Sequence, residues 1–110
     1  MLILYHNPRC SKSRQALALL EDGGVDFSIR RYLDEPLDPE EISHLVSIVD
    51  SDPGELVRTS DGAFKDSSFS MDSDVVEILL ALPGVMQRPI LSDGEKAVIG
   101  RPPENILQLL

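Results

Sequence analysis

The sequence predicts an α/β fold in which a βαβ segment and a ββα segment are separated by helices. A short apolar segment, a helical segment and a second short apolar segment follow one another in residues 2–32. Near the C-terminus, two more apolar segments flank an Asp-Gly pair, a strong signal for a β hairpin. A chain of 110 residues has the length of one domain, so we expect a single domain over residues 1–110 with a helical insertion at about 38–83.

The N-terminal segment predicts two strands joined by a helix. Leu2–Tyr5 is apolar and ends at a turn signal, as expected of a buried strand. A helix beginning at Ser11 or Ser13 and ending at Asp22 follows, because apolar residues recur on one face and two glycines then stop it. Residues 25–32 alternate between apolar and polar side chains, which predicts a half-exposed strand. The crossover should be right-handed and the two strands parallel.

The clearest helix start in the sequence lies at Asp38. We expect Asp38 to be the N-cap, Pro39 the first helical residue, and Glu41 the residue that completes a capping box. Apolar residues then recur at the spacing of an amphipathic helix: Ile42, Leu45, Val46 and Val49.

Two further helices and a loop complete the middle of the chain. The sequence around Pro53 repeats the helix start signal and predicts a short helix. Residues 59–70 are polar and contain glycine, so we expect a loop with room for one helical turn. Asp72 or Ser73 is expected to cap another helix, which Pro83 stops.

The C-terminal third predicts a hairpin and a final helix. Strands are expected within residues 87–91 and 96–99, on either side of the Asp-Gly turn. Pro89 has no N–H to donate to a sheet, so it should open its strand. The final helix is expected from Pro103 to Leu110.

Charge indicates the kind of partner that the chain can bind. The net charge is −9 and is unevenly distributed: residues 1–31 carry five basic and three acidic side chains, whereas residues 34–77 carry two basic and thirteen acidic ones. The overall acidity argues against a nucleic-acid partner, and the basic first segment favours a small anion. We expect the acidic middle to be a solvated face, with docking of a partner as the weaker alternative.

Localisation is predicted from what the sequence lacks. No apolar segment approaches the length of a membrane span, and the N-terminus has neither the basic region nor the cleavage site of a signal peptide. The single cysteine cannot form an internal disulfide. We therefore expect a cytoplasmic monomer with no membrane partner, no bound metal and no bound cofactor.

Cys10 is the only cysteine and the strongest candidate for chemistry. It lies where the first predicted strand passes into a helix, and the unpaired N–H groups and dipole of a helix N-terminus favour an anion. Beside Arg and Lys, the pKa of such a thiol falls from about 8.5 to roughly 3.5–7.5. A lone cysteine is more often a small buried hydrophobe, but the neighbours here are polar and charged. We therefore interpret Cys10 as a nucleophile.

The two histidines receive different interpretations. His6 either lies near the Cys10 thiolate and tunes its charge or hydrogen-bonds within its own loop, and both alternatives stay open. His44 falls on the polar side of its predicted helix, so we expect it to face solvent.

Four motifs occur in order along nearly the whole chain. They are Tyr-His-Asn-Pro-x-Cys-x-x-Ser-Arg at 5–14, Leu-Val-Arg at 56–58, Arg-Pro-Ile at 88–90 and Gly-Arg-Pro-Pro-Glu at 100–104. Together with the order of elements, they resemble the glutaredoxin-dependent arsenate reductase family. The resemblance implies a thioredoxin-like fold with a helical insertion between its two halves. Cys-x-x-Ser alone would be weak evidence, but four motifs together are specific.

The resemblance also implies roles for individual residues. Cys10 matches the nucleophile of the family, and three arginines match the residues that hold the arsenic oxyanion: Arg58, Arg88 and Arg101. The supporting positions are His6 and Asn7 of the active-site loop, Ser13 of the Cys-x-x-Ser motif, and Pro89 as a cis-proline facing the cysteine. Arg9, Lys12 and Arg14 are secondary contributors to the local field or to glutathione docking.

The chemistry of arginine supports oxyanion binding independently of the resemblance. Planar guanidinium groups grip oxyanions with paired hydrogen bonds. Any single arginine is more often a surface salt-bridge residue. Arg88 and Arg101, however, both precede proline at the edges of the predicted hairpin, so their backbones should be extended. We expect these two side chains to converge on one end of the sheet.

The implied activity is reduction of arsenate to arsenite, with glutathione as co-substrate and glutaredoxin as protein partner. One alternative is a monothiol oxidoreductase that handles glutathione or disulfides without arsenate turnover. Another is a non-enzymatic redox regulator similar to the Spx proteins. Those proteins typically carry Cys-x-x-Cys, whereas Ser13 takes the second position here, so the regulator is the weaker alternative. Retention of three arginines favours the reductase over general thiol exchange.

Overall fold

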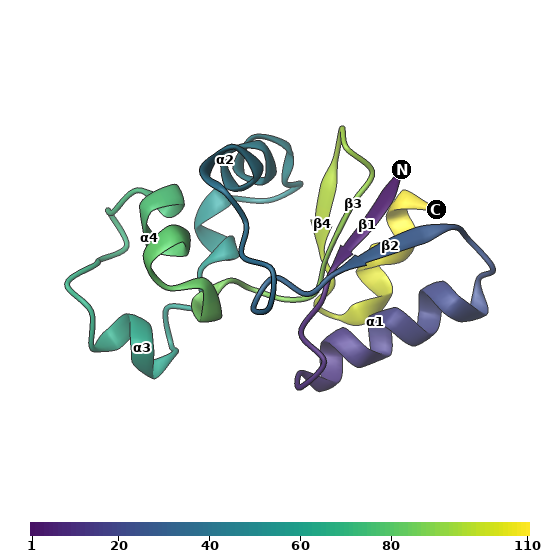
Figure 1. Ribbon diagram of the computed structural model, residues 1–110, viewed down its shortest axis with the longest axis horizontal. Coiled ribbons are helices and arrows are strands. Elements are labelled where there is room, and N and C mark those ends of the chain that lie inside the picture. Colours follow the sequence, from purple (N-terminus) through teal and green to yellow (C-terminus); the bar gives the residue numbers. More distant parts are fainter.

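A mixed four-stranded sheet lies at the centre of the structure. In a computed structural model that describes all of residues 1–110, β1 (Leu2–Tyr5) and β2 (Phe27–Arg30) run parallel. β3 (Ile90–Ser92) pairs antiparallel with β1 and with β4 (Ala97–Ile99). The strand order is β2-β1-β3-β4 (Figure 1). This arrangement confirms the predicted βαβ and ββα segments and the thioredoxin-like fold.

Helices from the two ends of the chain cover one face of the sheet (Figure 1). α1 (Ser11–Asp22) connects β1 to β2, and the 3₁₀ helix η3 (Pro103–Leu109) follows β4, so both predicted helices are confirmed. Their buried side chains and those of the sheet form one of two hydrophobic clusters. It consists of Leu4, Ala16, Leu20, Leu91, Val98 and Ile106.

The helices that lie between β2 and β3 form a group on one side of the sheet, away from α1 and η3 (Figure 1). They are α2 (Pro39–Ile48), η1 (Pro53–Leu56), α3 (Gly62–Lys65), α4 (Val75–Ala81) and η2 (Pro83–Val85). Tyr5 and Ile90 alternate with Leu4 and Leu91 along their strands and so contribute to a second, larger cluster shared with these helices. None of the helices in the molecule combines the length and apolar character needed to cross a membrane.

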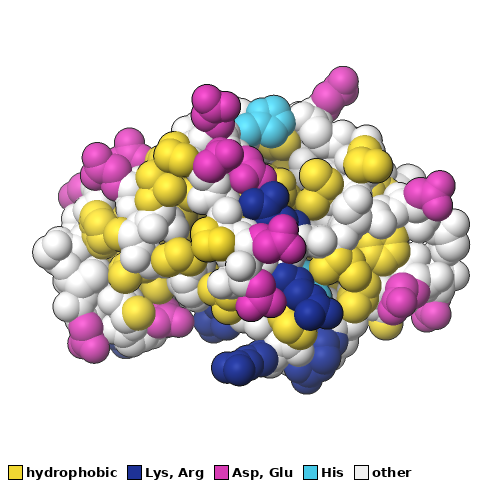
Figure 2. Space-filling model, in the orientation of Figure 1, with side chains coloured by type: hydrophobic (Ala, Val, Ile, Leu, Met, Phe, Trp, Pro, Cys, Tyr) yellow, Lys and Arg dark blue, Asp and Glu magenta, His cyan; other side chains and the backbone are white.

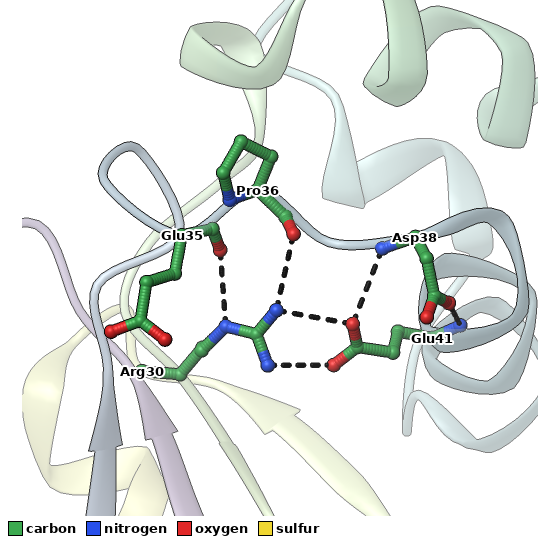
Figure 3. Close-up of polar contacts among 5 residues, drawn as sticks. All are labelled: Arg30, Glu35, Pro36, Asp38 and Glu41. Atoms are coloured by element: carbon green, nitrogen blue, oxygen red, sulfur yellow. Dashed lines mark hydrogen bonds and ion pairs between the residues drawn. The ribbon is translucent and has the colours of Figure 1, made fainter.

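Arg30, the last residue of β2, anchors α2 to the sheet (Figure 3). Its guanidinium donates to the carbonyl oxygens of Glu35 and Pro36 at 3.0 and 3.1 Å, and to both carboxylate oxygens of Glu41 at 2.9 and 3.1 Å. The Glu41 carboxylate also accepts the Asp38 N–H, while the Asp38 carboxylate accepts the Glu41 N–H. The predicted capping box is therefore confirmed, and one arginine fixes both the loop and the start of α2.

Three predicted boundaries were wrong. β3 covers Ile90–Ser92 rather than residues 87–91, because its pairing with β1 runs from Ile90 to Ser92. α4 is capped by Asp74, which accepts two backbone N–H groups of the first turn, and not by Asp72 or Ser73. All three residue types are good N-caps, so composition alone could not choose among them. β2 covers Phe27–Arg30 rather than residues 25–32, because its partner β1 offers only four residues for pairing.

Gly100 allows the chain after β4 to lie against Pro89. A Cβ atom on Gly100 would be 2.7 Å from Cγ of Pro89 and 3.1 Å from Cγ2 of Ile106, closer than packed side chains tolerate. The Gly100 N–H donates to the Pro89 carbonyl at 2.8 Å. The Arg88–Pro89 peptide bond is cis. Glycine is therefore required here for a close approach of two segments that carry site residues.

We expect Gly100→Ala to lower the free energy of unfolding by about 1–3 kcal/mol, because the added methyl group overpacks a filled site. Denaturant unfolding measures this change. Gly62→Ala is the control, since no atom lies within 4 Å of a Cβ there, and its effect should stay within about 0.5 kcal/mol. Equal losses in the two variants would contradict the packing argument.

Candidate active site

Four residues stand two positions outside the paired residues of their strands, at the same end of the sheet. Counted from the last pair of β1 and β2, Asn7 corresponds to Tyr32, where the chain has begun to turn. The antiparallel pairing of β1 with β3 brings Asn7 level with Arg88, and that of β3 with β4 brings Arg88 level with Arg101. This edge row therefore consists of Tyr32, Asn7, Arg88 and Arg101, in that order.

Two hydrogen bonds lie between the strand ends and the edge row. The His6 N–H donates to the Arg30 carbonyl at 2.9 Å, which extends the contact of β1 with β2. Across the β3–β4 pair, Nε of Arg101 donates to the Arg88 carbonyl at 2.9 Å. As predicted, Arg88 and Arg101 lie at one end of the sheet.

Cys10 occupies the N-cap position of α1, next to the edge row. Its backbone is extended, with φ −93° and ψ 123°, and its N–H donates to the Asn7 carbonyl at 3.0 Å. The thiol is partly exposed, and Nη2 of Arg101 donates to Sγ at 3.5 Å. The sole thiol of the chain therefore combines access from solvent with direct contact to a guanidinium.

The environment of Cys10 favours the thiolate. Burial by itself raises the pKa of the Cys10 thiol, but the backbone N–H of Ser13, the Arg88 guanidinium, the backbone N–H of Lys12 and the charge of Arg101 together lower it below its ordinary value. Lys12 and Ser13 are the N2 and N3 residues of α1, whose N–H groups have no intrahelical acceptor. The predicted effect of the helix N-terminus is thus supplemented by two arginines from the hairpin.

Ser13 holds the loop that carries Cys10. Its buried hydroxyl accepts the Asn7 N–H at 3.0 Å and lies 2.6 Å from Nδ1 of His6. The Asn7 side-chain oxygen accepts the Arg9 N–H at 3.0 Å, which tightens the same loop. His6 therefore follows the second alternative, a hydrogen bond within the loop. Burial, followed by the charges of Arg31 and Arg14, lowers the pKa of His6, which keeps this ring neutral at pH 7.

Arg58 is not joined to the thiol. Its guanidinium pairs with the Asp61 carboxylate at 3.5 Å, while its backbone N–H donates to the Val85 carbonyl at 2.8 Å. The second contact places Arg58 beside the segment that leads into Arg88. Arg88 itself donates from Nη1 to the Gly84 carbonyl at 3.1 Å. The structure thus brings two of the three predicted arginines to the thiol and leaves the third nearby in an ion pair.

A basic patch surrounds the start of α1. Figure 2 shows Lys and Arg side chains gathered in the lower centre of the view, at the N-terminal end of that helix, whereas acidic side chains are spread over the rest of this face. Arg14 donates to the Pro8 carbonyl at 2.9 Å and so also stabilises the loop.

His44 lies away from this patch. It is exposed as predicted, and it donates to the Gly94 carbonyl at 2.7 Å.

The sequence interpretation missed Tyr32 as a member of the site. Tyr32 is only 2 % exposed and belongs to the larger hydrophobic cluster. In the sequence it looked like the apolar end of a strand. The signal that could have found it is the parallel pairing, because Tyr32 stands as far beyond β2 as Asn7 stands beyond β1.

A groove of about 810 Å³ lies between the inserted helices and the β4–η3 side of the molecule. Arg101 is the one member of the edge row that lines it, and Cys10 does not. No group of three or more His, Cys, Asp or Glu side chains is placed to hold a metal ion.

An activated cysteine at the N-terminus of the first helix, faced by arginines from the hairpin, defines a thioredoxin-fold protein with a thiolate site suited to anions. The model of the ArsC family matches residues 5–109, and the chain belongs to this family. A protein named arsenate reductase from Haemophilus influenzae is 37% identical over 99% of this chain and 98% of its own length.

A solved structure shares the fold in detail. The structure described as arsenate reductase from Vibrio cholerae has a TM-score of 0.86 and 33% identity, and it covers 99% of this chain and 97% of that one. A regulator is also similar: global transcriptional regulator Spx 1 of Bacillus cereus is 26% identical over 100% of this chain and 87% of its own length.

We expect Arg101→Ala to raise the pKa of Cys10, because the variant loses the charge that contacts Sγ. The ultraviolet absorbance of the thiolate, followed against pH, measures this change. Arg9→Ala removes the same charge from the neighbouring loop, where no side-chain contact with the thiol exists, and should shift the titration less. Equal shifts in both variants would show that general charge, not the contact, stabilises the thiolate.

We expect Ser13→Ala to destabilise the protein by about 1–3 kcal/mol, because it leaves the buried Asn7 N–H without an acceptor. Thermal or denaturant unfolding measures the loss. Ser11→Ala alters an exposed serine of the same helix and should stay within about 0.5 kcal/mol of the parent. A Ser13 variant as stable as the Ser11 variant would contradict the role of this hydroxyl in the loop.

Proposed function

We propose that the protein reduces arsenate to arsenite, with Cys10 as the nucleophile. The observation that carries the proposal is the contact of Arg101 with the Cys10 sulfur, 3.5 Å from Nη2, beside Arg88. Membership of the ArsC family and similarity to proteins named arsenate reductase support it. A thiolate alone suits many reactions, but guanidinium groups around it offset the repulsion between an anionic nucleophile and an anionic substrate.

In this proposal, Arg88 and Arg101 hold the oxyanion through charge-assisted hydrogen bonds. Arg58 joins them by exchanging the Asp61 carboxylate for the oxyanion. That exchange costs little free energy, since the Arg58–Asp61 pair spans 3.5 Å and both side chains are 28% exposed. Ion pairs of this kind contribute only about 0–1 kcal/mol to stability.

The chemistry proceeds in three transfers. The Cys10 thiolate attacks arsenic, and water or hydroxide leaves, to give a thiol-arsenate ester. The chain has no second cysteine, so an external thiol, glutathione, attacks the Cys10 sulfur. A sulfur–sulfur bond forms, the sulfur–arsenic bond breaks, and its electron pair reduces As(V) to As(III), which leaves as arsenite. Glutaredoxin then reduces the Cys10–glutathione disulfide. We place this reaction in the cytoplasm and assign it to a monomer.

The alternatives explain less of the site. A monothiol oxidoreductase that exchanges disulfides has no use for several guanidinium groups around its sulfur. A Spx-like switch needs a partner for Cys10 at position 13, where the structure holds a fully buried serine hydrogen-bonded within the loop. Similarity to a Spx regulator therefore reflects the shared fold in this proposal.

Arsenite formation from arsenate tests the proposal directly. We expect turnover with purified protein, glutathione, glutaredoxin and a recycling system, and loss of turnover when either thiol component is omitted. Cys10→Ser should abolish turnover, because an alcohol is not ionised at neutral pH. Turnover that survives in Cys10→Ser would refute the mechanism. No arsenite from the parent, together with fast reaction of Cys10 with oxidised glutathione, would favour the monothiol alternative.

Arg88→Lys should lower kcat/KM for arsenate by about 10- to 100-fold, because an ammonium group cannot replace the guanidinium fork. Steady-state kinetics and a melting curve measure activity and stability side by side. Arg31→Lys makes the same exchange at an exposed arginine outside the edge row and should leave both unchanged. A parallel loss of activity and stability in Arg88→Lys would indicate a structural role instead.

A further inference from the structure

Two buried side-chain atoms in the molecule have no hydrogen-bond partner, and both belong to the edge row. They are the hydroxyl oxygen of Tyr32 and Nε of Arg88. Buried polar groups are almost always hydrogen-bonded, so each exception needs an explanation. The charge of Arg88 and the side chain of Asn7 both act on the pKa of Tyr32, so the two atoms lie in the same part of the molecule. Their proximity indicates one common cause at the site of Cys10.

The ring of Tyr32 is packed among apolar side chains. A small cavity beside it is lined mainly by Pro36, Leu37, Ile42, Leu79 and Met86. The charged groups that act on its hydroxyl are those of the site, namely Arg88, Cys10 and Arg58. The phenol thus combines an apolar body with a polar end on which the charges of the site act.

The Tyr32 hydroxyl is a proton donor at neutral pH. Burial raises the pKa of Tyr32, and the positive charge of Arg88 and the nearby Asn7 side chain oppose this effect without cancelling it. The Asn7 amide can only donate to the phenol oxygen, so the hydroxyl proton still has no acceptor. The neighbouring acceptor is already engaged, because the side-chain oxygen of Asn7 accepts the Arg9 N–H. Arg88 is in a similar state: Nη1 is bound to the Gly84 carbonyl, while Nε has nothing to bind.

We propose that the Tyr32 hydroxyl and Nε of Arg88 donate hydrogen bonds to the oxyanion bound at Cys10, so that Tyr32 is a substrate-binding residue. The inference rests on the proposed function in so far as the substrate is a tetrahedral oxyanion. Such an anion presents several acceptor oxygens and can satisfy two donors at once. A disulfide has only weak acceptors and would leave both groups unpaired.

The proposal predicts opposite effects of Tyr32→Phe on binding and on stability. Arsenate affinity should fall by about 10- to 100-fold, since a hydrogen bond to a charged group is lost. The melting temperature of the free protein should be unchanged or higher, because the variant removes a buried hydroxyl that has no partner. If Tyr32 only stabilised the fold, Tyr32→Phe would lower the melting temperature and leave the arsenate affinity unchanged.

Protection of Cys10 from alkylation by iodoacetamide, titrated with arsenate in the absence of reductant, measures affinity without turnover. Tyr5→Phe is the matched control. It removes a hydroxyl from the same hydrophobic cluster, but the charged groups that act on it are Glu41 and Arg30 rather than the thiol. Tyr5→Phe should retain the parent affinity. Parent affinity in Tyr32→Phe would overturn the proposal.

A second measurement does not depend on the folding of Tyr32→Phe. The chain has two tyrosines and no tryptophan, so Tyr32 is the sole strong near-ultraviolet chromophore in Tyr5→Phe. Arsenate should perturb its absorption spectrum at the concentrations that protect Cys10. An unperturbed spectrum under full protection would also overturn the proposal.

The outcomes separate this inference from the proposed function. Protection of Cys10 that depends on Tyr32, without arsenite formation by the parent, refutes arsenate reduction and supports the oxyanion contact. Arsenite formation by the parent with unchanged affinity in Tyr32→Phe refutes the contact alone. Absence of protection in the parent refutes both.

Discussion

The register of the sheet is the constraint on which the site depends. β2, β1, β3 and β4 pair so that the residues two positions outside the pairs come to the same end of the sheet, although they are far apart in the chain. A slip of one residue in any pairing would turn the corresponding side chain to the other face. The close approach of Gly100 to Pro89 and the anchoring of β2 by Arg30 hold this register at its two sides.

Electrostatics makes the resulting edge reactive despite a net charge of −9. Arg101 both holds its own guanidinium in place and contacts the thiol: Nε donates to the Arg88 carbonyl, while Nη2 donates to the sulfur of Cys10. The backbone hydrogen bond fixes the guanidinium, so little side-chain freedom is lost when it meets an anion. With the N-terminus of α1 on the other side of the thiol, a local positive field forms where a small anion can approach.

The sequence predicted features with a local cause. The capping box at Asp38, the Asp-Gly hairpin and the position of Cys10 at the start of α1 each follow from a few adjacent residues. Features that depend on distant contacts were not predictable. The pairing of Arg58 with Asp61 and the burial of the Tyr32 hydroxyl require the packed structure. The choice of Asp74 as cap depended on small differences among adjacent residues.

A crystal structure of the protein soaked in arsenate, without reductant, would test the central claim most directly. We predict an oxyanion at the Cys10 sulfur, with its oxygens bound by Arg88 and Arg101 and by the hydroxyl of Tyr32. An oxyanion bound elsewhere, or an unoccupied thiol at saturating arsenate, would contradict the account. Such a result would mean that the edge row serves the fold and not an anionic substrate.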